Sequence, residues 1–389
     1  MHVIERLAVP EGRLPGSPGD RRAVEMVGAE LESMGRRAEA EEIRVRPAWF
    51  LTFGFLAVLA AAGTVLSTVS APAGAVVLLI AAAALYGDLA AGFYSFRLCT
   101  PRRTTANVTS RERRESPAAR VILTAHHDSG RTGLLYALPR LRGPVRRRRA
   151  TLTSAPHFLF WSTMVALVTA IVRLGVDNGA LTALQFALVV VFLTYVVLLL
   201  DVAAASPSAG ASDNAAGVAT VLEAGRRLTG SPVQLVETWI VLTGAGDGGP
   251  LGMRAWLQEH AGSLRGVPTY FVNVKGPGNG RVCHVVGEGQ ATLVRNDERL
   301  ARLCEQAGSE RHVWRLGTDA TAASSFGFAA ITLTCLDEKG RIPHSHRPTD
   351  TPENVDPAAV EAATDTVERL VRLIDQAVAA ERRPRAAAR

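Results

Sequence analysis

Lysine is scarce in this chain, and closely spaced cysteines are missing. The 389 residues include 43 Lys and Arg, of which only Lys275 and Lys339 are lysines. The remaining 41 are arginines, which we attribute to coding bias and not to a nucleic-acid partner. The four cysteines are far apart in sequence: Cys99, Cys283, Cys304 and Cys335. Without a Cys-x-x-Cys pair, a disulfide scaffold and a thiolate zinc finger are excluded.

Charge is also scarce, and the apolar residues are unevenly distributed. Charged residues make up 20% of the chain and apolar residues 48%, whereas soluble domains usually have about 25% charged residues. The apolar excess is concentrated in four runs with one acidic residue, Asp88, among them: 49–69, 73–96, 155–172 and 180–200. Each run reaches the ~18–20 residues that span the hydrocarbon core of a bilayer. We therefore expect four transmembrane helices, arranged as two hairpins.

The arginine distribution predicts the orientation of these helices. Segment 97–150 contains 14 arginines against three acidic residues, including an unbroken run at 146–149, while the turns inside the two hairpins carry almost no net charge. The positive-inside rule places this segment and both termini in the cytoplasm of a multi-pass inner-membrane protein. Residues 1–47 contain no apolar segment typical of a signal peptide. We expect the arginine run to set topology, with contact to anionic lipid as the alternative.

The residues outside the four runs predict one α/β domain interrupted twice. Short apolar runs at 120–125, 235–242, 269–274 and 331–335 are typical of buried strands, and helical spacing occurs at 19–34, 213–228, 251–264, 297–307 and 358–379. We expect a three-layer α/β/α fold with a mostly parallel mixed sheet. The expected divisions are 1–47 (domain start), 48–96 (first hairpin), 97–150 (first strands and arginine-rich loop), 151–204 (second hairpin), 205–380 (remainder of the domain) and 381–389 (frayed basic tail).

Polar motifs follow several of these strands. They read AHHDS at 125–129, SDNAAG at 212–217, GAGDGGPLG at 244–252 and HSHRPTDT at 344–351. In a parallel sheet, chemistry gathers where the carboxyl ends of strands meet. Histidine and carboxylate groups on separate strands suit a metal such as zinc. Each motif alone also has an ordinary structural reading, as a hydrogen-bonded turn or a helix N-cap.

The order of these motifs resembles family 28 of the metallopeptidases, the co-catalytic zinc aminopeptidases related to transferrin-receptor-like proteins. The resemblance also includes the opening GRLPGSPG at 12–19, Asn107-Val108 and Thr318-Asp319, which adds Asp319 to the candidate site. Both apolar hairpins are insertions relative to the family. The resemblance implies a zinc exopeptidase fold, a peptide substrate and two zinc ions that share an aspartate.

Carried over position by position, the resemblance implies a role for five residues. His126, Asp213, Asp247 and His346 fall on metal-ligand positions, with Asp213 as the bridging carboxylate. Asp128 falls on the carboxylate that orients the first histidine and is a candidate catalytic residue, as is Asp247. The neighbouring histidines, His127 and His344, do not fall on ligand positions and are expected to be ordinary loop residues.

Two positions depart from the family pattern. Gly246 stands where the family has the glutamate that acts as general base, a contribution typically worth 10²–10⁴-fold in rate. Lys275 stands where the family has an aspartate ligand, and an ammonium cannot bind a metal. We expect the ammonium to stand in the place of one metal, paired with Asp213, so that the protein holds one zinc ion or none. The double change Gly246→Glu with Lys275→Asp is expected to restore a base and a ligand together.

Three functions are therefore compatible with the sequence. The first is a membrane-anchored zinc aminopeptidase that hydrolyses N-terminal peptide bonds with an altered site. The second is an inactive pseudo-peptidase that serves as a binding or scaffold module for a protein partner at the inner membrane face. In the third, the four helices form a small transporter in which Asp88 is the intramembrane acid.

Overall fold

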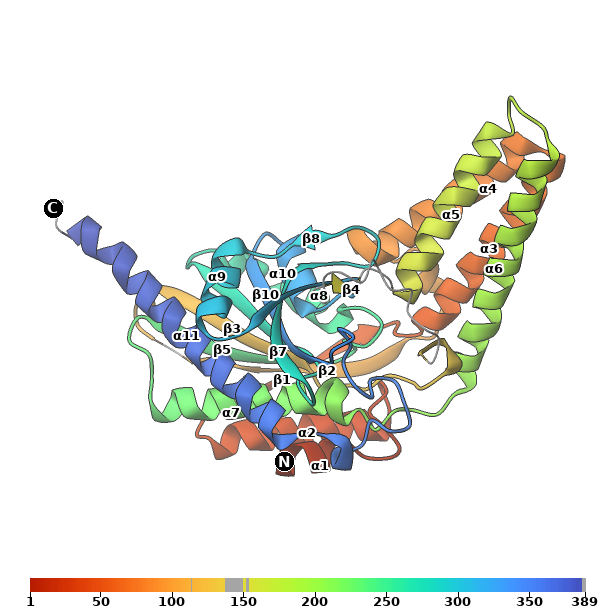
Figure 1. The fold of residues 1–389 in the computed structure, drawn as a ribbon. Helices are drawn as coiled ribbons and strands as arrows, with labels where there is room; N and C mark the ends of the chain where they lie inside the picture. Colours follow the sequence, from red (N-terminus) through yellow and green to blue (C-terminus); the bar gives the residue numbers. More distant parts are fainter. Residues whose placement is uncertain (113, 137–149, 152–153, 387–389) are drawn as a thin grey trace.

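The fold is described from a computed structural model that covers residues 1–112, 114–136, 150–151 and 154–386 (Figure 1). The arginine run at 146–149 lies outside these residues. An α/β domain occupies the centre of the molecule, and a bundle of long helices projects from one side of it (Figure 1). The two predicted parts are therefore spatially distinct, although the chain leaves the domain for the bundle and returns to it twice.

A single mixed sheet forms the middle layer of the domain. The described residues contribute ten strands in the order β1-β2-β5-β3-β6-β10-β7-β9-β4, with β8 paired to β7. The strands are β1 Glu39–Val45, β2 Arg103–Ser110, β3 Ala119–His126, β4 Ala150–Thr151, β5 Val236–Thr243, β6 Thr269–Val274, β7 Arg281–Glu288, β8 Val294–Arg295, β9 Glu310–Trp314 and β10 Ala329–Leu336. The central strands β5, β3, β6 and β10 run parallel, whereas β1, β2 and β7 are antiparallel to a neighbour. The expected mostly parallel mixed sheet is confirmed.

Helices cover both faces of this sheet. The alternation of side chains along β3 sends Val121 and Leu123 into the core beneath one helical layer and Ile122 into the core on the opposite face. The first layer contains α1 His2–Leu7, α2 Pro18–Ser33, α7 Ala216–Gly230, α9 Glu298–Gln306 and α11 Pro357–Ala386, and the second contains α8 Leu251–Leu264 and α10 Asp319–Ser325. The three-layer α/β/α prediction is confirmed. The tail was predicted to fray from residue 381. The helix α11 instead continues to Ala386, so the predicted starting residue is wrong.

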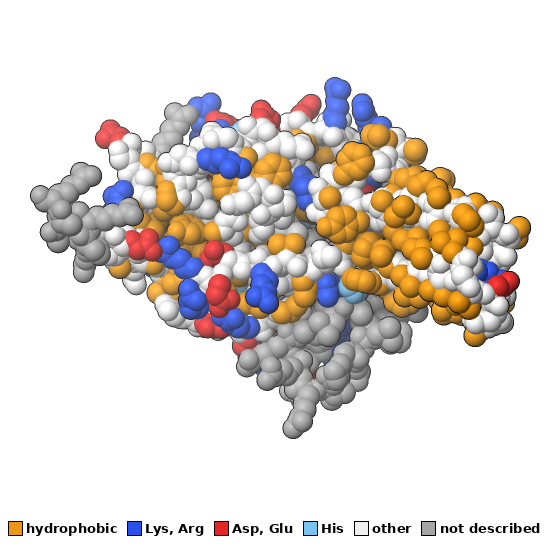
Figure 2. All heavy atoms as spheres, turned by 90° about the horizontal axis from the view of Figure 1, so that it is seen from above, with side chains coloured by type: hydrophobic (Ala, Val, Ile, Leu, Met, Phe, Trp, Pro, Cys, Tyr) orange, Lys and Arg blue, Asp and Glu red, His pale blue; other side chains and the backbone are white. Residues whose placement is uncertain are grey.

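Four long apolar helices form the projecting bundle. They are α3 Trp49–Val69, α4 Ala71–Tyr86 with a π-helical turn at Gly87–Ala91, α5 Ala155–Val172 and α6 Gly179–Ala204. Among the described residues these four helices are long and apolar enough to cross a membrane, by length and composition. Seen from above, apolar side chains concentrate on the bundle, while charged side chains are scattered over the domain (Figure 2). The second helix ends at residue 91, five residues earlier than the apolar run suggested.

A buried ion pair joins the first hairpin to the domain. Arg97 donates two hydrogen bonds to Asp88, at 2.7 and 2.8 Å, and both side chains are almost fully buried. The same guanidinium donates to the Gly248 carbonyl at 3.0 Å. The indole of Trp49, at the start of α3, packs against Gly248, whose φ of +73° and lack of a side chain permit this approach. The loop after β5 is therefore held directly by the helical hairpin.

Candidate functional site

The candidate site lies at the carboxyl ends of the central strands. His126 is the last residue of β3 and pairs with Thr243 at the end of β5, while Lys275 directly follows β6. Asp213 lies in the π-helical turn Ala211–Ala215 before α7, and Asp247 lies in the loop after β5. His346 comes from the loop after β10. Parallel strands thus bring residues from five distant parts of the chain together, as the motifs predicted.

Lys275 occupies the centre of this cluster. Its Nζ lies 2.9 Å from Nε2 of His126 and 2.8 Å from Oδ1 of Asp213. Burial lowers the pKa of Lys275, but the nearby carboxylates of Asp213 and Asp247 outweigh it and hold the pKa above its usual value. Burial likewise opposes ionisation of Asp213, but the ammonium keeps the pKa of that carboxyl well below its usual value. Lys275 and Asp213 therefore form an ionised pair, and the ammonium lies within hydrogen-bond distance of Nε2 of His126.

Asp128 orients both His126 and the loop after β5. Its Oδ1 lies 3.2 Å from Nδ1 of His126 and accepts a hydrogen bond from Gly246 N, and its Oδ2 accepts one from Asp247 N at 3.0 Å. Burial would raise the pKa of this carboxyl, but these partners lower it. Asp128 therefore lies where the resemblance predicted, and it contacts the first histidine.

His346 and Asp247 form the second half of the cluster. Nε2 of His346 lies 3.2 Å from Oδ1 of Asp247 and 3.9 Å from Oδ2 of Asp213. The imidazole stacks on the ring of Tyr136 at 4.0 Å between centroids, and its Nδ1 lies 3.0 Å from the Arg131 carbonyl oxygen. Burial lowers the pKa of His346, and Asp247 raises it above its usual value. The imidazole is thus held on three sides.

Gly246 has no room for a side chain. A Cβ atom built at this position would lie 2.2 Å from Cβ of His126 and 2.5 Å from its Cγ. Contacts this short are not tolerated in a packed interior. Gly246→Glu therefore cannot supply a base while His126 keeps its place, and the expected rescue by Gly246→Glu with Lys275→Asp would require His126 to move.

Asp319 lies beneath the cluster and not in it. Its Oδ2 accepts hydrogen bonds from the hydroxyls of Thr124 and Thr243, both at 2.8 Å. Burial raises the pKa of this carboxyl. Because Thr124 is on β3 and Thr243 ends β5, Asp319 ties α10 to the strands that carry the site. The two histidines that fall off ligand positions also point elsewhere: His127 lies 2.9 Å from the Ala106 carbonyl oxygen, and His344 lies 2.8 Å from the Thr349 hydroxyl.

Four further residues position the cluster and were not predicted as site residues. Ser345 donates to Oδ2 of Asp213 at 2.7 Å, so both carboxylate oxygens have a protein partner. Asp350 accepts from the backbone N–H of Ser212 at 2.6 Å, and burial raises the pKa of Asp350 to about 6.

The other two act through the backbone. Asn214 donates to the carbonyls of His126 and Val274, both at 3.2 Å, and joins the ends of β3 and β6. The buried guanidinium of Arg13 donates to the carbonyls of His127 and Gly210 at 2.7 and 3.0 Å. Ser345, Asp350, Asn214 and Arg13 all lie within the quoted motifs, so their position in the motif was the available signal.

A cavity of about 630 Å³ opens beside the cluster. Asp213, Asp247, Lys275 and His346 line one part of it. Side chains of the long helices line another part, among them Phe53 of α3, Phe158 of α5 and Val191 and Leu198 of α6. The candidate site and the apolar bundle therefore share one cavity.

Comparisons with known proteins give a family match for part of the chain and similar solved structures. Residues 196–371 match the sequence model of peptidase family M28. This match supports membership of the chain in peptidase family M28. No curated protein matches the sequence.

Solved structures with the same fold have low sequence identity to this chain. An aminopeptidase from Aneurinibacillus sp. strain AM-1 has a TM-score of 0.56 at 12% identity, covering 95% of this chain and 92% of that one. A Bacteroides thetaiotaomicron glutaminyl cyclase, bound to N-acetylhistamine, has a TM-score of 0.55 at 12% identity over 95% of each chain. A Zn-dependent exopeptidase from Parabacteroides distasonis has a TM-score of 0.53 at 12% identity over 95% and 96%. At this identity the likeness establishes the fold alone.

The first zinc position that the resemblance implies does not fit a metal here. Its two remaining ligands, His126 and Asp213, both face the Lys275 ammonium within hydrogen-bond distance. A cation at this point would repel a second one. Lys275 thus fills the space that zinc would need, as the sequence led us to expect.

The second zinc position is only partly assembled. Asp213, Asp247 and His346 offer suitable donor atoms, but two atoms bound to one zinc at about 2.1 Å cannot be more than about 4.2 Å apart. Among the described residues, the one trio of His, Cys, Asp or Glu side chains with ligand atoms within 4.8 Å of one another is elsewhere. The structure therefore does not fit two zinc ions. The ligand atoms of Asp213, Asp247 and His346 would have to move closer together before they could bind one.

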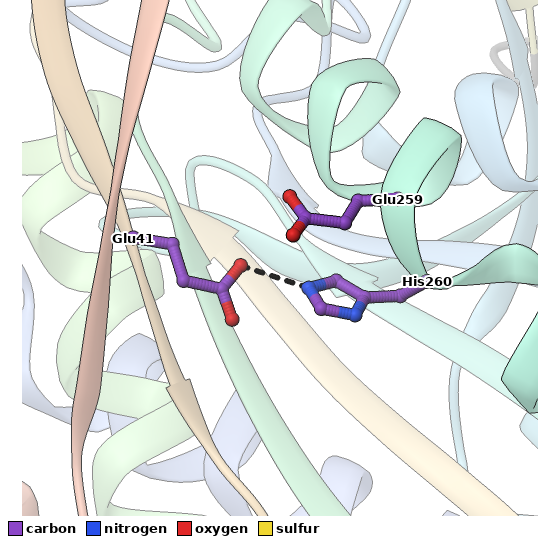
Figure 3. Close-up of side chains that lie close together, drawn as sticks. All are labelled: Glu41, Glu259 and His260. Carbon is purple, nitrogen blue, oxygen red and sulfur yellow. Dashed lines mark hydrogen bonds and ion pairs between the residues drawn. The ribbon is translucent and has the colours of Figure 1, made fainter.

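That trio consists of Glu41, Glu259 and His260 (Figure 3). Glu41 projects from the edge strand β1, and the other two lie on α8. Glu41 already pairs with His260 at 2.8 Å and with Arg111 at 3.2 Å. These ion pairs account for the cluster, and we assign it no metal.

Proposed function

We propose that this chain is a membrane-anchored pseudo-peptidase, an M28 fold whose site binds a ligand without hydrolysing it. The observation that carries this proposal is the position of the Lys275 ammonium, 2.9 Å from His126 and 2.8 Å from Asp213. The absence of a side chain at Gly246, and the lack of room for one, support it further, because the usual general base is missing. A cluster whose charges are already balanced suits binding and scaffolding better than metal-assisted hydrolysis.

A single-zinc aminopeptidase is the second candidate. The 3.2 Å separation between His346 and Asp247 favours it, because it is close to the spacing of two ligands on one ion. In that case Asp213, Asp247 and His346 would hold the zinc, and the zinc would polarise the peptide carbonyl. His346→Ala would then abolish zinc binding, and His126→Ala would affect it less.

Turnover separates the two candidates. The wild-type protein, purified in detergent and supplied with zinc, is assayed on amino-acid anilides with and without a chelator, beside the Asp247→Asn variant. The proposal predicts no difference in rate between the two proteins and no effect of the chelator. Chelator-sensitive turnover that is lost in Asp247→Asn would overturn the pseudo-peptidase and establish the aminopeptidase.

We also propose that the four apolar helices span the cell membrane with the α/β domain in the cytoplasm. The lengths of α3, α4, α5 and α6 and the arginine-rich segment 97–150 support this orientation. Among the four cysteines, Cys99 is exposed and the other three are buried. A membrane-impermeant maleimide should therefore label Cys99 only after cells are permeabilised. Labelling of Cys99 in intact cells, beside a Cys99→Ser control, would reverse the orientation.

A further inference from the structure

We propose that the cavity beside the candidate site binds an amphiphile with one hydrocarbon chain and an anionic head group. This inference rests on the proposed function, because it assigns a ligand to a site that does not hydrolyse. Two features of the cavity support it: an apolar wall formed by the long helices, and a buried arginine nitrogen at the domain side that has no hydrogen-bond partner among the described residues.

The apolar wall comes from three of the four long helices. Phe53 of α3, Phe158 of α5 and Val191 of α6 line the cavity, and Leu198 extends the wall by two turns of α6. Val190 of α6 is exposed on the outside of the bundle and also lines the cavity, so the apolar wall reaches the outer surface of the bundle. Because burying apolar surface is favourable in proportion to its area, a hydrocarbon chain suits this wall.

The volume of the cavity also suits such a ligand. At about 630 Å³ it lies within the range of roughly 300–1,000 Å³ typical of small-molecule sites. Its polar part is formed by the candidate site, where Lys275 pairs with Asp213 and Asp247 pairs with His346. The charges of these residues are paired with one another, so a charged ligand is not needed to neutralise them.

Arg315 is the residue in the cavity that favours binding of an anion. It lines the cavity just after β9, and its buried Nε has no hydrogen-bond partner among the described residues. Another arginine of the cavity, Arg341, is by contrast paired with Asp337 at 3.1 Å. A buried guanidinium nitrogen without a partner is costly, and a carboxylate or phosphate oxygen would satisfy it with a charge-assisted hydrogen bond.

The position of Arg315 suits a head group at the membrane surface. Gln290 and Ala155 line the same cavity as Arg315, and the Gln290 carbonyl oxygen lies 2.9 Å from Nδ1 of His157 in the first turn of α5. The basic group therefore lies in the same cavity as the end of a membrane-length helix. Basic side chains at such ends attract anionic lipid groups.

Equilibrium binding tests the proposal with the full chain in phosphatidylcholine nanodiscs, with empty nanodiscs subtracted. The probes are radiolabelled oleate, oleoyl lysophosphatidate, oleyl alcohol and oleylamine. The two anionic probes should bind in a saturable manner at least tenfold more tightly than the alcohol or the amine. The stronger of the two anions then distinguishes a carboxylate from a phosphate head group. Equal binding of the alcohol would overturn the anionic head group.

Three variants locate the site. Val191→Trp fills the apolar wall and should abolish saturable binding. The matched control is Val197→Trp on the same helix, where the side chain is exposed on the bundle surface and does not line the cavity, and binding should be unchanged. Arg315→Gln should weaken binding of the anions about tenfold and leave the alcohol unchanged, as expected for loss of one charge-assisted hydrogen bond. Binding that survives Val191→Trp would overturn the cavity as the site.

The same samples separate this inference from the proposed function. Saturable amphiphile binding together with chelator-sensitive peptide turnover would overturn the pseudo-peptidase and leave the ligand class intact. Absence of both saturable binding and turnover would overturn the ligand class and leave the pseudo-peptidase intact.

Discussion

The ammonium of Lys275 lies 2.8 Å from Oδ1 of Asp213, inside a site whose family relatives are expected to hold metal. Both side chains are at least nine-tenths buried. Removing one partner of a buried pair leaves an uncompensated charge, which typically costs about 3–5 kcal/mol. The pair therefore stabilises this arrangement only as a unit, and this predicts how the site responds to substitution.

Lys275→Met should lower the melting temperature strongly. It leaves the Asp213 carboxylate buried and facing only the Ser345 hydroxyl and the histidines. Adding Asp213→Asn should restore part of the loss, because the unpaired charge is then removed as well. The chain offers a matched control in its other lysine: Lys339 is exposed, and Lys339→Met should change stability by less than about 0.5 kcal/mol. Thermal unfolding in detergent measures all three variants, and equal effects of both Lys→Met changes would contradict the pairing.

Gly246→Ala should destabilise the protein by about 1–3 kcal/mol, the usual cost of overpacking. Even one methyl group meets His126 at this position. The control is Gly262→Ala on α8, where a Cβ meets nothing within 4 Å. There the change should be neutral or stabilise by up to about 1 kcal/mol, since alanine favours helix. A neutral Gly246→Ala in denaturant unfolding would show that the loop after β5 has more room than the structure gives it.

Asp88→Asn should be far more harmful than the same change in an exposed ion pair. Asp88 and Arg97 are each 3% exposed, and Arg97 also holds the Gly248 carbonyl of the site loop. The loss should be about 3–5 kcal/mol. In the hairpin of α5 and α6, Asp177 pairs with Arg173 but is 78% exposed, so Asp177→Asn should cost less than about 1 kcal/mol. Similar melting temperatures for the two variants would indicate that the Asp88 pair does not anchor the hairpin.

Acid should destabilise the domain through His284 on β7. Burial lowers the pKa of this imidazole to about 4, and its Nδ1 lies 2.9 Å from the Ser309 hydroxyl oxygen. The unfolded chain, with a histidine pKa near 6.5, then binds more protons than the folded chain between pH 6.5 and 4. Stability is therefore lost as the pH falls through this window, by up to about 3 kcal/mol for this residue.

His284→Phe isolates this contribution. The variant should show a smaller loss of melting temperature between pH 7 and pH 5 than the wild type. An identical pH profile in the two proteins would mean that His284 is not buried in its neutral form.

The fold was largely predictable where packing leaves a regular pattern. The runs at 120–125 and 269–274 are buried on both faces of a parallel sheet, so their continuous apolar character marked them as strands. The strands β1 and β7 were not predicted, because β1 reads EAEEIRV and β7 carries an arginine and a histidine among its apolar residues. β1 lies at the edge of the sheet and is half-buried, and polar residues interrupt the apolar run of β7, so neither strand has the continuous apolar pattern of the central strands.

The residues of the candidate site could be predicted from the sequence, but the packing around them could not. Motif positions after the strands were sufficient to bring His126, Asp213 and His346 together, because parallel strands end at one edge. The place of the Lys275 ammonium followed from the resemblance, in which Lys275 falls on a metal-ligand position. The lack of space at Gly246 and the cavity shared with α6 did not, because both depend on how separate elements pack against each other.

Zinc content tests the central claim most directly. The wild-type protein is equilibrated with excess zinc in detergent, freed of unbound metal, and measured by elemental analysis against protein concentration. If the Lys275 ammonium holds the place of one metal between His126 and Asp213, the chain will retain no more than one zinc ion. Two tightly bound zinc ions per chain would contradict the account.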